Sequence, residues 1–157
     1  KGDRQLVIAT LADALSWKGE NKVDAMFVDT AFGAVVVWEL RARGFTNVYE
    51  VNFGGESPDP YNANQRAFQW NGMKEWLPKG CIPKDDQRLE ADLCGPGFHL
   101  DRKNRRVLES KEDMLTRGLA SPDDGDALSL TFAQPVQVKE AEPAEEYRPR
   151  GRSYMAG

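Results

Sequence analysis

Acidic side chains are the residues of this sequence whose placement best suits chemistry. Asp29 follows the apolar run 26–28 directly, and a carboxylate at the carboxyl end of a buried strand lies where open α/β sheets bind ligands. Asp123 and Asp126 are three positions apart, so a helix would carry both on one face and point Asp124 elsewhere. Carboxylates supply the oxygen ligands that Mg²⁺ prefers. The sequence therefore offers a candidate site for a divalent cation.

The same acids also have ordinary structural interpretations. Asp29 could cap the helix that follows its strand, and acids in the first turn of a helix complement the positive end of the helix dipole. Spacing alone leaves both interpretations open. Arg66, within NANQRAFQW, could likewise be an internal ion-pair partner or a DNA contact, and we favour the internal role.

Basic side chains that could contact phosphates cluster in two places. One group lies in and beside the polar turn 102–104, where a solvated hairpin tip is the alternative interpretation. The other group lies in the segment 110–117. The candidate DNA contacts are Lys111, Arg117, Arg102 and Lys103.

Histidine and cysteine chemistry is restricted by composition. The single histidine, His99, cannot build a His-rich metal site within one copy of the chain. Cys81 and Cys94 form no Cys-x-x-Cys pair and are interpreted as free thiols in a reducing compartment. The net charge of −4 argues against a broad DNA-binding surface, although an acidic average can coexist with one basic face. Hydrolytic chemistry would therefore rest mainly on carboxylates.

The first half of the chain predicts a parallel βαβ arrangement. Residues 4–16 are expected to form an amphipathic helix with Val7, Leu11 and Leu15 on one face. A strand at 25–29, a helix at 33–43 and a strand at 47–53 follow. Short connections between alternating helices and strands imply parallel strands joined by a crossover helix.

The second half predicts helices around a hairpin. Ser121 is expected to cap a late helix, with Pro122 at its first position and acids in its first turn. Residues 1–136 form the predicted domain, and the charged segment 137–157 a flexible tail. No apolar run approaches the roughly 20 residues of a membrane span. The remaining predicted elements are a loop at 54–62, helices at 63–77 and 85–93, a hairpin of 97–101 with 105–109, and helical turns at 110–117.

The order of these motifs resembles the C-terminal nuclease domain of phage terminase large subunits, the DNA-packaging motors. The apolar strand ending at Asp29 and the stretch from Tyr61 to Arg66 resemble successive parts of that domain. The family pattern Glu-Ser-Lys-Glu-Asp, Arg-Gly and Ser-Pro-Asp-x-x-Asp-Ala-Leu is reproduced at 109–113, 117–118 and 121–128. The resemblance covers about residues 4–136.

The resemblance implies a ribonuclease H-like α/β sheet with flanking helices and a cleavage site that holds Mg²⁺ or Mn²⁺, expected to be two ions. Asp29 would be the carboxylate on the central strand, Asp126 the one on the late helix, and Asp123 a possible further ligand. The family also uses an aspartate on a first antiparallel hairpin upstream of 4–16. We therefore expect a partial domain, truncated at its N-terminus, lacking that hairpin and the ATPase domain, which cuts DNA slowly or not at all.

The resemblance also implies partners and a place of action. These are double-stranded DNA, the portal protein, the terminase small subunit and the ATPase domain of the same polypeptide, at the procapsid portal in the host bacterial cytoplasm, with no membrane. The activity would be a metal-dependent endodeoxyribonuclease that cuts concatemeric genomes during packaging.

Two alternatives stay open: a catalytically incomplete docking fragment, or another ribonuclease H-like nuclease such as a resolvase. A metal titration discriminates the first, because a docking module needs no metal.

Overall fold

A computed structural model describes residues 3–136 of the chain, and the predicted tail 137–157 lies outside the described residues. The first half contains α1 (Arg4–Leu15), the short 3-10 helix η1 (Gly19–Asn21), β1 (Met26–Asp29), α2 (Thr30–Ala42) and β2 (Val48–Val51). The second half contains α3 (Gln65–Trp76), α4 (Gln87–Cys94), β3 (Phe98–Leu100), β4 (Arg106–Leu108), α5 (Lys111–Thr116) and α6 (Asp123–Leu130).

The predicted parallel strands and crossover helix are confirmed. β1 pairs with β2 in parallel, with Met26 opposite Val48 and Asp29 opposite Val51. The carboxyl ends of both strands therefore lie at the same edge of this small sheet. The helix α2 connects the two strands and packs against both.

A compact apolar core holds this half together. Ile8 and Leu15 of α1 pack with Val37 and Leu40 of α2 and with Val48 of β2. The predicted packing of the first two helices against the sheet is thus confirmed.

The prediction that Val7 begins the buried face of α1 is wrong by one residue. Val7 is 46% exposed, whereas its neighbour Ile8 is fully buried. Ile8 and Leu15 are seven residues apart, which is two helical turns, and Leu11 packs partly buried between them. The sequence allows an apolar face that begins at Val7 or at Ile8. Packing against α2 buries the face that begins at Ile8.

The crossover helix α2 begins earlier than predicted. Asp29 caps α2 by accepting the backbone N–H of Ala31 at 3.3 Å, so the helix starts at Thr30. A Cβ at Gly33 would lie 2.3 Å from Cγ1 of Val28. Glycine at this position therefore allows the first turns of α2 to lie directly against β1.

The predicted hairpin is confirmed as the antiparallel pair of β3 and β4. Its turn is organised by Asp101, whose carboxylate accepts the backbone N–H groups of Lys103 and Arg105. The N–H of Arg105, followed by its side chain, lowers the pKa of Asp101 to about 2. Asn104 takes the left-handed conformation that closes the turn, with φ of 60°.

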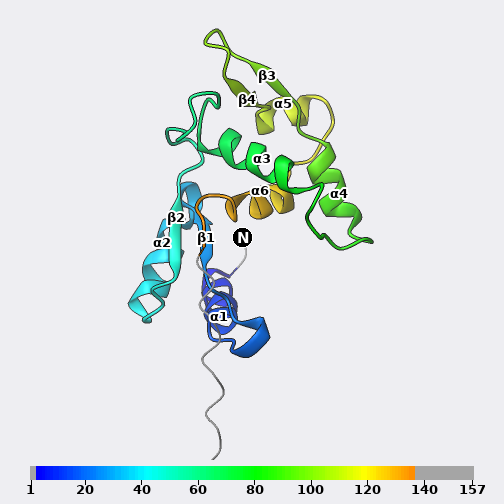
Figure 1. Cartoon of the computed structure of the whole chain (residues 1–157). Helices are drawn as coiled ribbons and strands as arrows, with labels where there is room; N and C mark the ends of the chain where they lie inside the picture. The colour runs from blue at the N-terminus through cyan, green and yellow to red at the C-terminus, as the bar shows by residue number, and fades with distance from the viewer. Residues whose placement is uncertain (1–2, 137–157) are drawn as a thin grey trace, which may run out of the picture.

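The described residues form a mixed α/β structure in which α6 connects two groups of elements (Figure 1). The two-stranded parallel sheet and the hairpin are separate sheets. The helix α6 packs against α3 and α4 on one side and also contacts β1. Within residues 3–136, no helix combines the length and the apolar character needed to cross a membrane.

Candidate functional site

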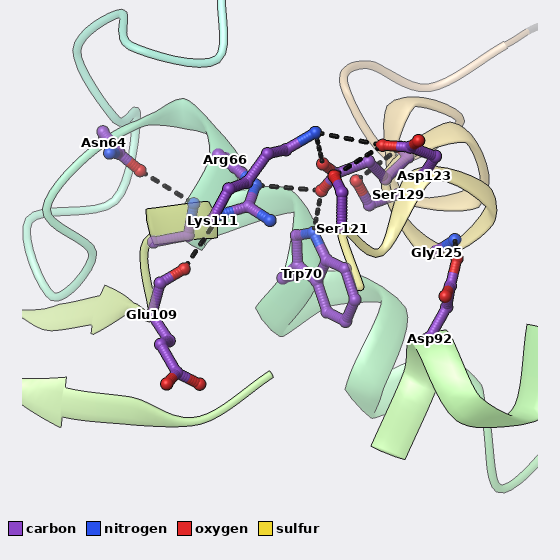
Figure 2. Close-up of polar contacts among 12 residues, drawn as sticks. Asn64, Arg66, Trp70, Asp92, Glu109, Lys111, Ser121, Asp123, Gly125 and Ser129 are labelled. Carbon is purple, nitrogen blue, oxygen red and sulfur yellow. Dashed lines mark hydrogen bonds and ion pairs between the residues drawn. The ribbon is translucent and has the colours of Figure 1, made fainter. Parts of the chain in front are cut away.

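Asp126 is the buried acid at the centre of the candidate site. It lies on α6, and its side chain is 7% exposed. Its Oδ1 atom accepts two hydrogen bonds of 2.9 Å, one from Nε of Arg66 and one from Nε1 of Trp70 (Figure 2). A buried carboxylate is costly without such partners, so this ion pair is a strong constraint on the fold.

Arg66 is confirmed as an internal ion-pair partner. It lies in the first turn of α3, and its side chain is 12% exposed. Its Nη1 atom also donates to the backbone carbonyl of Glu109 at 3.2 Å. This one guanidinium therefore ties α3 to α6 and to the segment after β4.

Lys111 approaches the same carboxylate from the exposed side. Its Nζ atom lies 3.1 Å from Oδ2 of Asp126 and 3.2 Å from Oδ1 of Asp123. Burial alone would lower the pKa of Lys111, but the two carboxylates outweigh it and the pKa is raised. The pKa of Asp123 is lowered, first by the hydroxyl of Ser121 and then by Lys111. At neutral pH, Lys111 is therefore an ammonium between two carboxylates.

The N-terminus of α6 is capped differently from the prediction. Pro122, not Ser121, takes the N-cap position, and it supplies no side-chain cap. Ser121 instead donates its hydroxyl to the Asp123 side chain at 2.6 Å. Oδ2 of Asp92, on α4, accepts hydrogen bonds from the backbone N–H groups of Asp124 and Gly125, at 2.8 and 3.2 Å. A carboxylate from another helix thus performs the capping that the local sequence was expected to perform.

Gly125 makes room for the indole that contacts Asp126. A Cβ at this position would lie 2.9 Å from Cη2 of Trp70 and 3.3 Å from Cβ of Asp92. Gly125→Ala should therefore lower the free energy of unfolding by about 1–3 kcal/mol, since overpacking outweighs the better helix propensity of alanine. Urea denaturation of both proteins measures this difference.

Gly72→Ala is the matched control, because Gly72 lies inside α3 near the same cluster. A Cβ there would meet the Phe132 side chain at 3.6 Å, an ordinary contact. Alanine should be neutral or stabilise the helix by up to about 1 kcal/mol. If Gly125→Ala proved as harmless as Gly72→Ala, the close packing of Trp70 on α6 would not exist.

The other predicted site residues lie in separate places. Asp29 lies at the end of β1 and caps α2, which is the ordinary role that the sequence left open. Within residues 3–136, no three His, Cys, Asp or Glu side chains form a group that could hold a metal ion. Asp124 pairs with Arg88 of α4 at 2.7 Å, away from Lys111. The prediction that Asp29 shares a metal site with Asp126 stays a prediction.

The predicted DNA contacts lie in two different environments. Arg102 and Lys103 are exposed at the tip of the β3–β4 hairpin. Arg117 is paired with Glu109 at 2.6 Å and also donates to the carbonyl of Gly95, so it holds the hairpin against α5. The hairpin tip therefore offers exposed cations, whereas Arg117 is already engaged within the protein.

Two residues of the cluster were missed by sequence reasoning. Trp70 follows Arg66 by four positions on α3, a spacing that puts both on one helical face and could have indicated a shared partner. Asp92 carried no signal, because it lies more than thirty positions from the N–H groups that it caps.

The chain matches no protein-family model, and no curated protein matches it.

Proposed function

We propose that this chain belongs to a terminase-type DNA endonuclease, in which Asp126 is the central acidic residue and the fold is ribonuclease H-like. The observation that carries the proposal is the convergence of three separate motif segments. Arg66 ends the stretch 61–66, Lys111 lies in 109–113, and Asp126 lies in 121–128, yet Arg66 and Lys111 both contact the Asp126 carboxylate. Three of the segments on which the resemblance rests therefore build a single polar cluster, whereas the strand that ends at Asp29 lies apart from it.

In this proposal, the cluster would hold one divalent cation between Asp123 and Asp126. Oδ2 of Asp126 is buried and receives no hydrogen bond in the described residues, and it faces the Lys111 ammonium at 3.1 Å. Asp123 directs Oδ1 to the same ammonium. Oδ2 of Asp126 and Oδ1 of Asp123 are thus the oxygens that would hold a Mg²⁺ or Mn²⁺ ion. Two ions would also require Asp29 and a further carboxylate to approach Asp126.

The residues of the cluster have distinct roles in this proposal. A divalent cation bound here would polarise a phosphodiester and lower the pKa of a water molecule. Arg66 and Trp70 both donate to Oδ1 of Asp126 and so aim Oδ2 toward the ligand side. The exposed hairpin cations Arg102 and Lys103 would contact the DNA backbone. Because phosphate contacts carry no direct sequence information, cleavage should show little base preference.

The proposed biological setting follows from the resemblance. The enzyme would cut concatemeric double-stranded DNA at the procapsid portal in the host bacterial cytoplasm. Its partners would be the portal protein, the terminase small subunit and an ATPase domain.

A plasmid-relaxation assay tests the proposal directly. The protein that contains these residues should convert supercoiled plasmid to the nicked form in Mn²⁺ or Mg²⁺, and excess chelator should stop the reaction. Cleavage that persists in chelator would rule out a metal-dependent mechanism.

A non-enzymatic docking role is the second candidate. It is favoured by the absence, within residues 3–136, of a group of three metal-ligating side chains, and by the engagement of both Asp126 oxygens with Arg66, Trp70 and Lys111. Isothermal titration with Mn²⁺ separates the two candidates, because a docking module has no reason to bind the ion. Absence of Mn²⁺ binding by the folded protein would favour the docking role.

A further inference from the structure

The strand β3 of the hairpin has a free edge. The N–H of Asp101 donates to the carbonyl of Arg105 across the hairpin, and backbone bonding alternates along an antiparallel pair. Phe98 and Leu100 therefore direct their N–H and C=O groups away from β4. Within residues 3–136, no other strand pairs with β3.

The opposite edge of the hairpin is already covered by an extended segment. The N–H of Arg106 in β4 donates to the carbonyl of Tyr61 at 2.7 Å, and the carbonyl of Arg106 accepts the N–H of Ala63 at 2.9 Å. The hairpin thus binds one extended stretch of its own chain on the β4 side. On the β3 side, the same kind of backbone groups are exposed.

An apolar groove of about 320 Å³ lies beside the free edge, between the hairpin and α3 (Figure 1). This volume is in the range of cavities that hold ligands. Phe98 is 62% exposed and borders both the edge and the groove. The other large apolar side chains of the groove are Trp70, Met73, Leu77, Leu93 and Leu108.

The charged side chains that line this groove are both positive. They are Lys74 of α3 and Arg106 of β4, and no carboxylate lines the groove. The Nζ atom of Lys74 lies 5.4 Å from the centre of the Phe98 ring. In the part of the chain that the structure describes, neither cation forms an ion pair. Because the whole chain carries a net charge of −4, the groove is opposite in sign to the protein.

We propose that the groove binds an extended peptide segment that pairs with β3 and presents one apolar and one acidic side chain, two positions apart. Side chains two positions apart lie on the same face of a strand, so the apolar one fills the groove and the acidic one meets Lys74 or Arg106. Addition of a strand to an exposed sheet edge is an established mode of peptide recognition.

Two other occupants match the groove less well. DNA has no backbone amides to pair with the N–H and C=O groups of Phe98 and Leu100. A second copy of β3 has the sequence Phe-His-Leu and brings no acid to the two cations. The proposal does not rest on the proposed nuclease function.

The first test is an NMR titration of the protein with two short peptides, acetyl-Thr-Leu-Thr-Glu-Thr-amide and acetyl-Thr-Glu-Thr-Leu-Thr-amide. The tighter of the two should bind about tenfold more tightly than the same peptide with Lys in place of Glu, because the cations attract one charge and repel the other. High salt should reduce this difference. The amide signals of Phe98 and Leu100 should move downfield, whereas that of His99, which faces β4, should move less.

A second test alters the peptide, so it does not depend on whether a protein variant folds. N-methylation of the Leu and Glu residues removes N–H groups from one edge of the bound strand, and N-methylation of the Thr residues removes them from the other edge. One of these two peptides should lose binding and the other should keep it, because only one edge meets β3.

A third test changes the charge of the groove. Lys74→Glu should abolish the preference for Glu over Lys in the peptide. Lys103→Glu is the matched control, because it makes the same charge change at the exposed hairpin tip, outside the groove. This variant should keep the preference.

The contrary outcomes are distinct. Equal affinity for the Glu and Lys peptides, or tolerance of both methylation patterns, would overturn the proposal. A short DNA duplex that shifts the Phe98 and Leu100 signals when neither Glu peptide does would assign the groove to DNA. Shifts that follow protein concentration without peptide would assign it to a second copy. None of these results bears on plasmid nicking, so this proposal and the proposed function fail separately.

Discussion

Asp126→Asn should lower plasmid nicking by the protein that contains these residues about 100-fold or more, a loss of roughly 2.7 kcal/mol in transition-state stabilisation. Asparagine keeps the shape of the side chain, but it carries no negative charge to hold a divalent cation at Oδ2. The assay is the rate of plasmid relaxation in Mn²⁺, measured at a temperature where the variant is folded.

Asp124→Asn is the control for the general acidity of the α6 start. Asp124 lies two positions from Asp126 but pairs with Arg88 and does not face Lys111. Its nicking rate should stay within about twofold of the wild type, since exposed ion pairs contribute little. Full nicking by folded Asp126→Asn would show that the chemistry lies on another residue.

Arg66→Met should lower the free energy of unfolding by about 3 kcal/mol. The substitution leaves the buried Asp126 carboxylate without its closest cation, and breaking a buried ion pair from one side typically costs about 3–5 kcal/mol. We expect the lower end of this range, because Lys111 and Trp70 still face Asp126. Urea unfolding followed by tryptophan fluorescence measures the change.

Arg88→Met is the matched control for Arg66→Met. Arg88 pairs with Asp124 at a similar distance, 2.7 Å, but the two side chains are 71% and 42% exposed. Its loss should cost less than about 1 kcal/mol.

The double variant Arg66→Met/Asp126→Asn should also lose less stability than the sum of the single variants, because the two residues share one contact. Additive effects would contradict the buried ion pair.

The ion pair also changes what is expected of Asp126 itself. From sequence, acids in the first turn of α6 had a simple interpretation as partners of the helix dipole. That interpretation suits Asp124, which is partly exposed, but Asp126 is 5% exposed and accepts two side-chain hydrogen bonds. Asp126→Asn should therefore reduce stability as well as activity, since Arg66 would lose its buried countercharge.

Local features of the sequence were sufficient to predict most of the elements. A strand at 25–29, its parallel partner at 47–53 and the hairpin were predicted, and the pairing of β1 with β2 and of β3 with β4 confirms them. Apolar runs, glycine at helix ends and polar turns act over a few neighbouring residues, so the sequence itself contains them. The start of α6 was misjudged because its cap comes from Asp92, a residue of another helix.

The sequence by itself determined which acids and bases are present, on which elements they lie, and that Asp123 and Asp126 share a helical face. Only the tertiary structure decided which of them meet. Arg66 and Asp126 are 60 positions apart, and their contact exists because α6 packs on α3. The same packing buries Asp126, leaves Asp124 partly exposed and places Lys111 between two carboxylates. Burial and ion pairing depend on contacts across the whole chain, and no local spacing specifies them.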